Sequence, residues 1–549
     1  MFNSKQKQLF SGNKQTTTSA FINAGLKSSA ITVSENGAKK YSTTGNPFVD
    51  QFSKLGSYKS PRSFNDISQD CELLWSNNSK LTVLFIFYIR MINRITQFWN
   101  GLKTTTPQKG GELKHEGIFR MIWLHFKAPK IFWKNIDLFI AAGSWKDIIT
   151  MLSYDLQYNG WNNRKLDWIQ FGNLILSGLE NKHSSELLKK YLPQIKSNNQ
   201  CKTLESQADN LIAKWICSLL FGNKGEESGT TYKKYRKLKT SGTAHEWQQL
   251  ISQRKFDRID FSKIHGRALN LLVRSKFLFN QNLSDKYAAW VSKPETEVKY
   301  TGFVHELFDK LPKTLISLPQ HNQDTINKQF NTLVKKGGEQ SQTSLIVVRD
   351  TSGSMGSQAT GTTMSCYNVA KALALYFSEF LTGSFSNAWI EFDSKAQMHT
   401  WIGNNPLEKW FNDKSSCIGS TNFQSVIQLF VSLKQQGIKE SDFPSGILCI
   451  SDSEFNPSSL NQTNVETAKQ TLLSGGFSKE YVNNFVIILW NLQSSGRGNK
   501  FETFGDVQNV FYFSGYSASV ISFLTNKIKT AEELFMSAMD QELLNMIEV

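Results

Sequence analysis

The spacing of apolar residues changes once along this chain. From residue 46 to about residue 335, apolar side chains recur at helical spacing, as at Phe132, Ile136 and Phe139, with short turns between segments. The pattern therefore predicts an all-α region of consecutive helical hairpins, like HEAT or armadillo repeats. The expected helices are Ser63–Asn77, Leu81–Trp99, Gly117–Phe126, Lys130–Ala142, Trp145–Tyr158, Leu166–Asn181, Ser184–Leu192, Leu204–Phe221, Phe261–Gln281, Leu283–Val291, Gly302–Leu311 and Gln320–Lys336.

After Ser344, short apolar runs alternate with helical patterns, as βα units do. The expected strands are Leu345–Arg349, Trp389–Phe392, Gln397–Trp401, Ile447–Ser451, Phe485–Trp490 and Val510–Phe513. The expected helices between and after them are Cys366–Leu381, Phe423–Gln436, Val465–Leu473, Ser519–Asn526 and a closing helix, Ala531 to Met546. Residues 341–549 are thus expected to form an α/β domain with a C-terminal helix.

The polar N-terminal segment and the helical region complete the expected organisation. Residues 1–45 are rich in Ser, Thr, Asn, Gln and Lys and are expected to be loosely ordered. The helical region covers residues 46–340. The sequence therefore predicts an α plus α/β protein with a flexible N-terminal segment.

Polar residues follow two of the predicted strands. Asp350, Ser352 and Ser354 come directly after the first strand, and Asp452 follows the strand Ile447–Ser451. Thr421 lies in a turn ahead of a helix. The carboxyl ends of parallel strands meet at one edge of a sheet, so these five side chains can converge. All are hard oxygen donors, which suit Mg²⁺ or Mn²⁺.

This ordered set resembles the metal-ion-dependent adhesion site (MIDAS) of the von Willebrand factor A (vWA) domain, a Rossmann-like fold. The resemblance implies that Ser352, Ser354 and Thr421 ligate the metal and that Asp350 and Asp452 act directly or through water. It also implies an open coordination position for an acidic residue of a protein partner.

Enzymatic interpretations find less support in the sequence. Ser354 lies in Ser-Gly-Ser-Met-Gly, which lacks the first glycine of the G-x-S-x-G nucleophile turn, and the only later histidine, His399, precedes Asp452. Three His-Glu pairs lack the second histidine of H-E-x-x-H, and no phosphate-binding glycine loop is present. We therefore expect no enzymatic activity.

Charge is distributed unevenly between the two regions. Residues 1–340 hold 49 Lys and Arg against 27 Asp and Glu, a net charge of +22, whereas residues 341–549 hold 13 against 19, a net charge of −6. A basic region of this size favours a polyanionic partner, most commonly nucleic acid, although lysines also solvate helices. We expect single-stranded or looped RNA.

The densest basic run lies in an expected surface loop within Asn223 to Thr243. There, cations alternate with tyrosines that could stack on unpaired bases. A solvated loop is an equally open interpretation of this run. More cations follow at spacings that could align part of them on one helix face. The candidate RNA-binding residues are Lys233, Lys234, Arg236, Lys237, Lys239, Arg254, Arg258, Lys263 and Arg267.

Compartment signals point to an intracellular, cytoplasmic protein. The six cysteines form no C-x-x-C pair, and the N-terminus lacks the apolar stretch of a secretory signal. The most apolar stretch, Leu81 to Ile89, is too short to span a bilayer, so we expect a core helix and no membrane insertion.

A helical-repeat region followed by a vWA-like site resembles the TROVE-vWA proteins, the Ro RNA-binding autoantigen family with its viral and bacterial relatives. Segments that resemble the viral and bacterial branch are Thr43 to Asp50, Arg254 to Ala268 and Tyr300 to Glu306. The resemblance implies a closed ring of helices that binds small noncoding or misfolded RNA, with a Mg²⁺-dependent partner site. The alternative is a non-enzymatic scaffold or viral structural protein that uses the same metal site for protein contacts.

Overall fold

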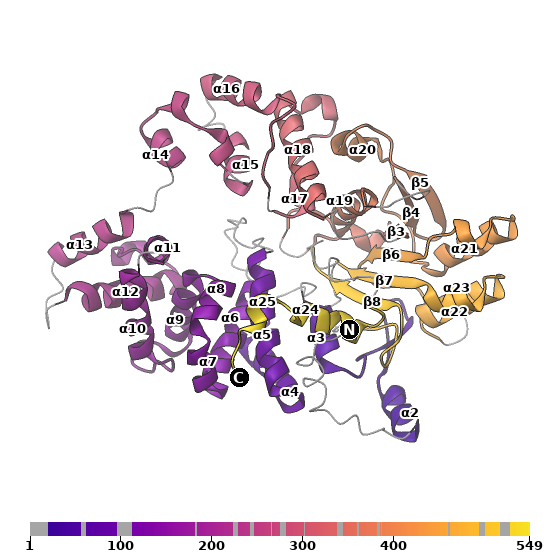
Figure 1. Ribbon diagram of the computed structural model, residues 1–549, viewed down its shortest axis with the longest axis horizontal. Coiled ribbons are helices and arrows are strands. Elements are labelled where there is room, and N and C mark those ends of the chain that lie inside the picture. The colour runs from indigo at the N-terminus through magenta and orange to yellow at the C-terminus, as the bar shows by residue number, and fades with distance from the viewer. Residues whose placement is uncertain are drawn as a thin grey trace.

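The computed structural model describes residues 20–55, 62–95, 112–181, 184–222, 229–241, 246–264, 266–274, 281–300, 302–337, 344–359, 362–380, 385, 387–458, 462–492, 500–516 and 528–549. The described residues before 340 are mostly helical, and those after 344 form a mixed sheet with helices (Figure 1). The expected helix Ser519–Asn526 lies outside the described residues.

The N-terminal region mostly follows the predicted helical pattern as far as residue 221, but the expected helix Gly302–Leu311 is reduced to the four residues Val304–Leu307. Its helices are α3 (Pro47–Lys54), α4 (Phe64–Asn77), α5 (Ser79–Ile95), α6 (Glu112–Lys127), α7 (Pro129–Lys134), α8 (Ile136–Ala142), α9 (Trp145–Asn159), α10 (Trp168–Glu180), α11 (Ser185–Tyr191), α12 (Leu204–Phe221), α13 (Gly229–Thr240), α14 (Glu246–Ser252), α15 (Gly266–Arg274), α16 (Gln281–Val291), α17 (Val304–Leu307) and α18 (Gln320–Gly337). Side chains fix several helix starts, as at Ser63, whose hydroxyl accepts from the Asp66 N–H in a capping box. Residues Leu81 to Ile89 are buried, as expected of a core helix.

The expected single helix Lys130–Ala142 is divided at Asn135. The Asn135 side-chain amide donates to the Ile131 carbonyl at 2.8 Å and to the Glu548 carbonyl at 2.7 Å. An asparagine that bonds nearby backbone competes with the helical ladder. Since Glu548 is distant in sequence, the break could not be read from local periodicity.

The C-terminal region contains a sheet that, within the described residues, has six strands in the order β5-β4-β3-β6-β7-β8. Neighbours are parallel except for β4 and β5. The strands are β3 (Leu345–Asp350), β4 (Ala388–Phe392), β5 (Ala396–Thr400), β6 (Gly446–Ser451), β7 (Val486–Asn491) and β8 (Val510–Ser514). The helices are α19 (Cys366–Ser378), α20 (Pro406–Asn412), α21 (Gln424–Gln435), α22 (Asn464–Ser474), α23 (Lys479–Asn484), α24 (Ala531–Met539) and α25 (Glu542–Asn545).

Alternate residues of the central strand β6 belong to two different cores. In β6, Ile447 and Cys449 belong to the core beneath α21 and α22, whereas Leu448 and Ile450 belong to the opposite core. That opposite core also contains buried side chains of α3 to α13, α17 and α18, whereas those of α15 and α16 form a separate core. One face of the sheet is therefore continuous with the interior of the helical region.

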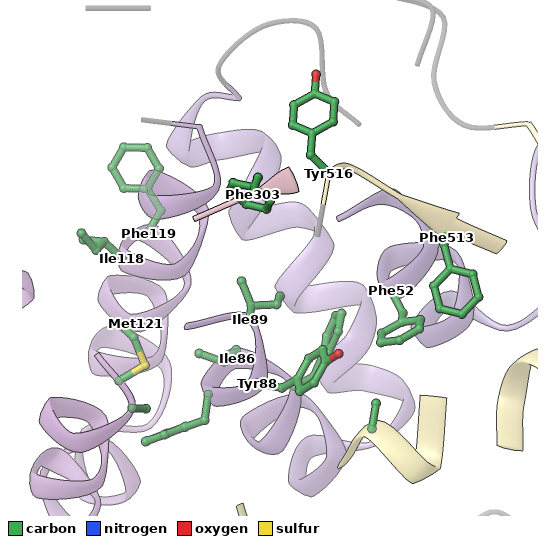
Figure 2. Close-up of a cluster of buried hydrophobic side chains, with 14 of the residues drawn as sticks. Phe52, Ile86, Tyr88, Ile89, Ile118, Phe119, Met121, Phe303, Phe513 and Tyr516 are labelled. Atoms are coloured by element: carbon green, nitrogen blue, oxygen red, sulfur yellow. The ribbon is translucent and has the colours of Figure 1, made fainter. Parts of the chain in front are cut away.

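The helical region contacts the sheet region at both of its ends (Figure 1). At one end, Phe535 of α24 packs on Phe48 and Phe52 of α3 and on Phe85 of α5, at ring-centroid distances of 5.6, 5.7 and 5.5 Å. Figure 2 shows Phe52 beside Phe513 of β8 in this cluster.

The other end rests on α19 and α20. There, Phe308 stacks on Trp410 at 4.5 Å, and Phe330 of α18 contacts Tyr376 at 6.2 Å. The closing segment, α24 and α25, which the sequence left free to pack on either region, contacts both, because α24 packs on α3 and on β8 and α25 packs on α5.

Residues 20–41 are more ordered than their composition predicts. They form α2 (Ala20–Ser29) and the hairpin β1 (Ile31–Val33) and β2 (Lys39–Tyr41). Lys40 makes a fully buried ion pair with Glu502 at 2.5 Å, and Tyr41 exchanges two backbone hydrogen bonds with Phe501. Contacts with residues distant in sequence therefore hold this segment in place.

Within the described residues, no helix combines the length and the apolar character needed to cross a bilayer.

Candidate metal centre

The end of β3 places three of the five predicted ligands together. Asp350 is fully buried, and its Oδ1 accepts from the Ser352 N–H at 2.8 Å. The Ser352 and Ser354 hydroxyl oxygens lie 3.1 Å apart. Ser352 is buried and Ser354 is exposed, so the cluster is closed on the protein side and open toward solvent.

The loop that carries Thr421 lies against this turn. The Ile418 N–H donates to the Thr351 carbonyl at 3.0 Å, and the Gly353 N–H donates to the Gly419 carbonyl at 3.1 Å. Gly419 has a φ of +108°, and a Cβ there would lie 2.8 Å from Asp393 Oδ2. Glycine is therefore required for the loop to approach this closely.

Thr421 and Asp452 are joined through the loop after β6. The Thr421 carbonyl accepts from the Asn456 N–H at 2.8 Å, and both the Thr421 and Asp452 side chains are buried. Ser451, which the sequence reasoning did not assign a role, donates its hydroxyl to Asp350 Oδ2 at 2.5 Å. Its position at the end of a strand, directly before Asp452, was the sequence feature that could have identified it. The five predicted residues therefore come from adjoining segments of one sheet edge.

The electrostatics of this edge favour a bound cation. Burial and, after it, the charge of Asp452 raise the pKa of Asp350 to about 7, although hydrogen bonds from Ser451 and Ser352 act to lower it. Two carboxylates that face each other in a buried site repel unless a positive charge lies between them. A divalent ion would supply that charge.

The donor set fits a hard divalent ion. Among the described residues, no group of three or more His, Cys, Asp or Glu side chains is arranged to hold a metal. A cation at this edge would therefore rest on two carboxylates and three hydroxyls, the oxygen ligands that suit Mg²⁺ or Mn²⁺.

The predicted basic loop is a helix along most of its length. Residues 229–240 form α13, with Lys233, Lys234, Arg236 and Lys237 exposed. Tyr235 is buried, and its hydroxyl donates to the Pro193 carbonyl at 2.9 Å. The loop interpretation was wrong because Tyr235 anchors the segment to its neighbours, and this tyrosine is not available to stack on a base.

Lys239 differs from the other cations of α13. Its ammonium donates to the Leu192 carbonyl and, at 3.4 Å, to the Lys190 carbonyl. Burial lowers its pKa. Lys239 therefore holds α13 in place.

The second group of predicted cations does not share a helix face. Arg254 has a left-handed φ of 57° after α14, and the chain continues through 3₁₀ turns at Phe256–Arg258 and Phe261–Lys263. Arg254 and Arg258 are exposed, whereas Lys263 lies 3.6 Å from Glu246. The Arg267 side chain lies outside the described residues. The expected helix Phe261–Gln281 was wrong at its start, because Asp260 accepts from the Ser262 N–H and starts a tight turn.

Comparisons with known proteins match both regions without assigning a function. Residues 344–546 match a family model described as "Domain of unknown function (DUF7788)". The chain is similar to "Uncharacterized protein L728" of Acanthamoeba polyphaga mimivirus, at 23% identity over 535 residues, which covers 90% of this chain and 85% of the relative. The similarity to a viral protein therefore extends through the helical region as well as the sheet.

Proposed function

We propose that this protein binds RNA through its helical region and captures an acidic group of a protein partner through a Mg²⁺ or Mn²⁺ ion at the sheet edge. The observation that carries the proposal is the buried pair Asp350 and Asp452, surrounded by hydroxyl groups and open to solvent at Ser354. In this proposal the C-terminal region is a vWA domain and its edge is a MIDAS.

Each predicted ligand has a distinct role in this proposal. Ser352, Ser354 and Thr421 contribute neutral oxygens, and Asp350 and Asp452 supply the negative charge. An ion with few direct carboxylates stays electron-poor and attracts an outside Asp or Glu. The site binds a partner and carries out no hydrolysis.

Two features of the fold support the architecture that accompanies this function. The strand order β5-β4-β3-β6-β7-β8 has a single antiparallel pair at one edge, as a doubly wound vWA sheet requires. The helical region meets the sheet region at both ends, as expected for HEAT-like helices in a ring closed by the vWA domain.

The RNA part of the proposal rests on charge. Residues 1–340 carry a net charge of +22, and four cations of α13 extend into solvent. Exposed cations bind phosphates with little sequence preference. We propose small noncoding or misfolded RNA with a single-stranded end as the ligand.

Calorimetric titration with Mg²⁺ tests the metal site. Asp350→Ala should abolish binding, because one of the two carboxylates is lost, while Asp442→Ala at an exposed position should leave binding unchanged. Unchanged Mg²⁺ affinity in Asp350→Ala would overturn the metal assignment.

Filter binding with a single-stranded RNA tests the second activity. We expect tight binding that weakens steeply with salt and persists in Asp350→Ala, because the exposed cations of α13 belong to the helical region and the five predicted metal ligands belong to the sheet region. Absence of RNA binding at physiological salt would leave the metal-dependent protein contact as the function, that of a scaffold or viral structural protein.

A further inference from the structure

The hairpin of β1 and β2 packs against the loop that follows Asp452. Three side chains of this hairpin, including the turn between its strands, donate to three successive backbone carbonyls of the loop. The donors and acceptors are Lys40 Nζ to the Ser453 carbonyl at 3.2 Å, Asn36 Nδ2 to the Glu454 carbonyl at 2.5 Å and Ser34 Oγ to the Phe455 carbonyl at 3.2 Å. The hairpin therefore holds the backbone of residues 453–455, although it lies 413 to 421 positions earlier in the chain.

The first residue of this loop has an unfavourable backbone conformation. Ser453 has a left-handed φ of 65°, which a residue with a Cβ rarely adopts. Such a conformation persists only where surrounding contacts hold it. The bond from Lys40 to the Ser453 carbonyl is one of these contacts, and Lys40 is itself fixed by Glu502, 2.5 Å away in a fully buried pair. The hairpin therefore stabilises the turn directly after Asp452.

Hydrogen bonds connect the same loop to two other predicted metal ligands. The Ser453 N–H donates to Ser451 Oγ at 2.9 Å, and this hydroxyl donates to Asp350 Oδ2 at 2.5 Å. The Asn456 N–H donates to the Thr421 carbonyl at 2.8 Å. A displacement of residues 453–456 would therefore alter the spacing of the predicted ligands on both sides of the site.

The hairpin acts on the geometry of the metal edge and not on its charge. Lys40 is paired with Glu502, so it adds no net positive charge there, and the donors from Ser34 and Asn36 are neutral. Geometry matters differently to different cations. Mg²⁺ demands nearly ideal octahedral coordination, whereas Ca²⁺ accepts irregular coordination. A loop that is out of place should therefore weaken Mg²⁺ binding more than Ca²⁺ binding.

We propose that the N-terminal hairpin is a positioning element of the metal centre, which holds the loop after Asp452 in the geometry that Mg²⁺ requires. Lys40, Asn36 and Ser34 are its positioning residues. The carboxylates of Asp350 and Asp452 repel each other when no cation is bound, so an unsupported loop would relax away from Asp350. This inference rests on the proposed metal site and extends it to a segment that precedes the helical region.

Calorimetric titration of the full chain with Mg²⁺ and with Ca²⁺ tests the proposal. The test variant carries Ser34→Ala and Asn36→Ala, which leave the buried pair of Lys40 and Glu502 unchanged. One hydrogen bond corresponds to about fivefold in affinity, so the affinity for Mg²⁺ should fall at least about tenfold. The affinity for Ca²⁺ should fall by at most about threefold. Val33→Ala, at an exposed position of the same hairpin, should bind both cations like the parent.

A second variant and a second measurement do not depend on the buried Ser34. Asn36→Ala alone, in the exposed turn, should weaken Mg²⁺ by about fivefold. Hydrogen exchange in EDTA, followed by mass spectrometry, reports the loop without any metal. In the double variant, amides of residues 453–456 should exchange at least about fivefold faster than in the parent, and those of β6 should exchange as in the parent. Val33→Ala should change neither.

Failure of this inference and failure of the proposed function give different results. Unchanged Mg²⁺ affinity in the folded double variant, an equal loss of affinity for Mg²⁺ and Ca²⁺, or unchanged exchange of residues 453–456 would overturn the positioning role and leave the metal site standing. Failure of the parent to bind Mg²⁺ would contradict the proposed metal site, and the inference would fall with it.

Discussion

Replacing Asp350 by Asn should stabilise the metal-free protein while abolishing its response to Mg²⁺. Asp350 is fully buried and lies near Asp452, and burial with this second charge raises its pKa to about 7. The charged form is therefore unfavourable without a cation. Asparagine keeps the size of the side chain and one carbonyl acceptor and removes the charge.

The size of the gain follows from the pKa. A folded-state pKa of about 7 in place of 3.8 corresponds to an upper bound of about 4 kcal/mol of destabilisation when Asp350 is ionised. The amide accepts one fewer hydrogen bond than the carboxylate, which accepts from Ser352 and Ser451, and this loss costs about 1–2 kcal/mol. We expect a net gain of about 2 kcal/mol in the free energy of unfolding.

The gain should depend on pH with a definite sign. Because the folded pKa of Asp350 is raised, its contribution to stability is fully present below pH 4 and is lost as the pH rises through 7. The charge of Asp350 should therefore make no difference to the free energy of unfolding of the two proteins near pH 4 and the largest difference above pH 7. Urea unfolding at pH 5 and pH 8 in EDTA measures the difference.

Adding Mg²⁺ should narrow the difference in stability between the two proteins, because it stabilises the parent alone. With a dissociation constant on the order of 1 mM, about 10 mM Mg²⁺ stabilises the parent by about 1.4 kcal/mol and leaves Asp350→Asn unchanged. Asp442→Asn, at an exposed carboxylate, should behave as the parent in every condition. If Asp350→Asn in EDTA is no more stable than the parent at pH 8, the electrostatic reasoning about this site is refuted.

Three further perturbations test other parts of the molecule. Changing Lys233, Lys234, Arg236 and Lys237 together to Gln should reduce the slope of log RNA affinity against log salt by about 3, at about 0.7 per lost phosphate contact, in filter binding. Phe535→Ala should lower the free energy of urea unfolding by about 3–5 kcal/mol, because it empties the space between α3 and α5. Asp413→Asn should destabilise by about 3–5 kcal/mol at neutral pH. Burial by itself would raise the pKa of Asp413, but Arg349 and Lys371 hold it well below its usual value, so the destabilisation should shrink below about pH 4, where the unfolded carboxylate takes up a proton.

Local patterns in the sequence predicted most of the secondary structure and the location of the candidate metal centre. The period of apolar residues marks α12 at its exact bounds, Leu204–Phe221, because each turn of an amphipathic helix must present an apolar side chain to the core. The metal edge is also predictable, since a parallel sheet brings strand ends together whatever their distance in sequence. Asp350 and Asp452 are therefore neighbours by topology.

The basic surface was less predictable, because cations of the same residue type make different contacts in the fold. Lys237 and Lys239 look alike in sequence, yet Lys237 is exposed and Lys239 donates to the Leu192 carbonyl directly after α11. Tyr235 likewise reads as a stacking residue until its buried contact with Pro193 is known. Such contacts join residues about 40 positions apart, so the local periodicity of apolar residues cannot predict them.

The contacts between the helical region and the sheet region also join residues distant in sequence, so local patterns could not predict them. The sequence separates the two regions by a change in period near residue 340, but one face of the sheet and most of the N-terminal helices share a single core. Phe535 closes that core from the last helices of the chain. The sheet that carries Asp350 therefore shares its core with the helices at both ends of the helical region, while α15 and α16 between them pack in a core of their own.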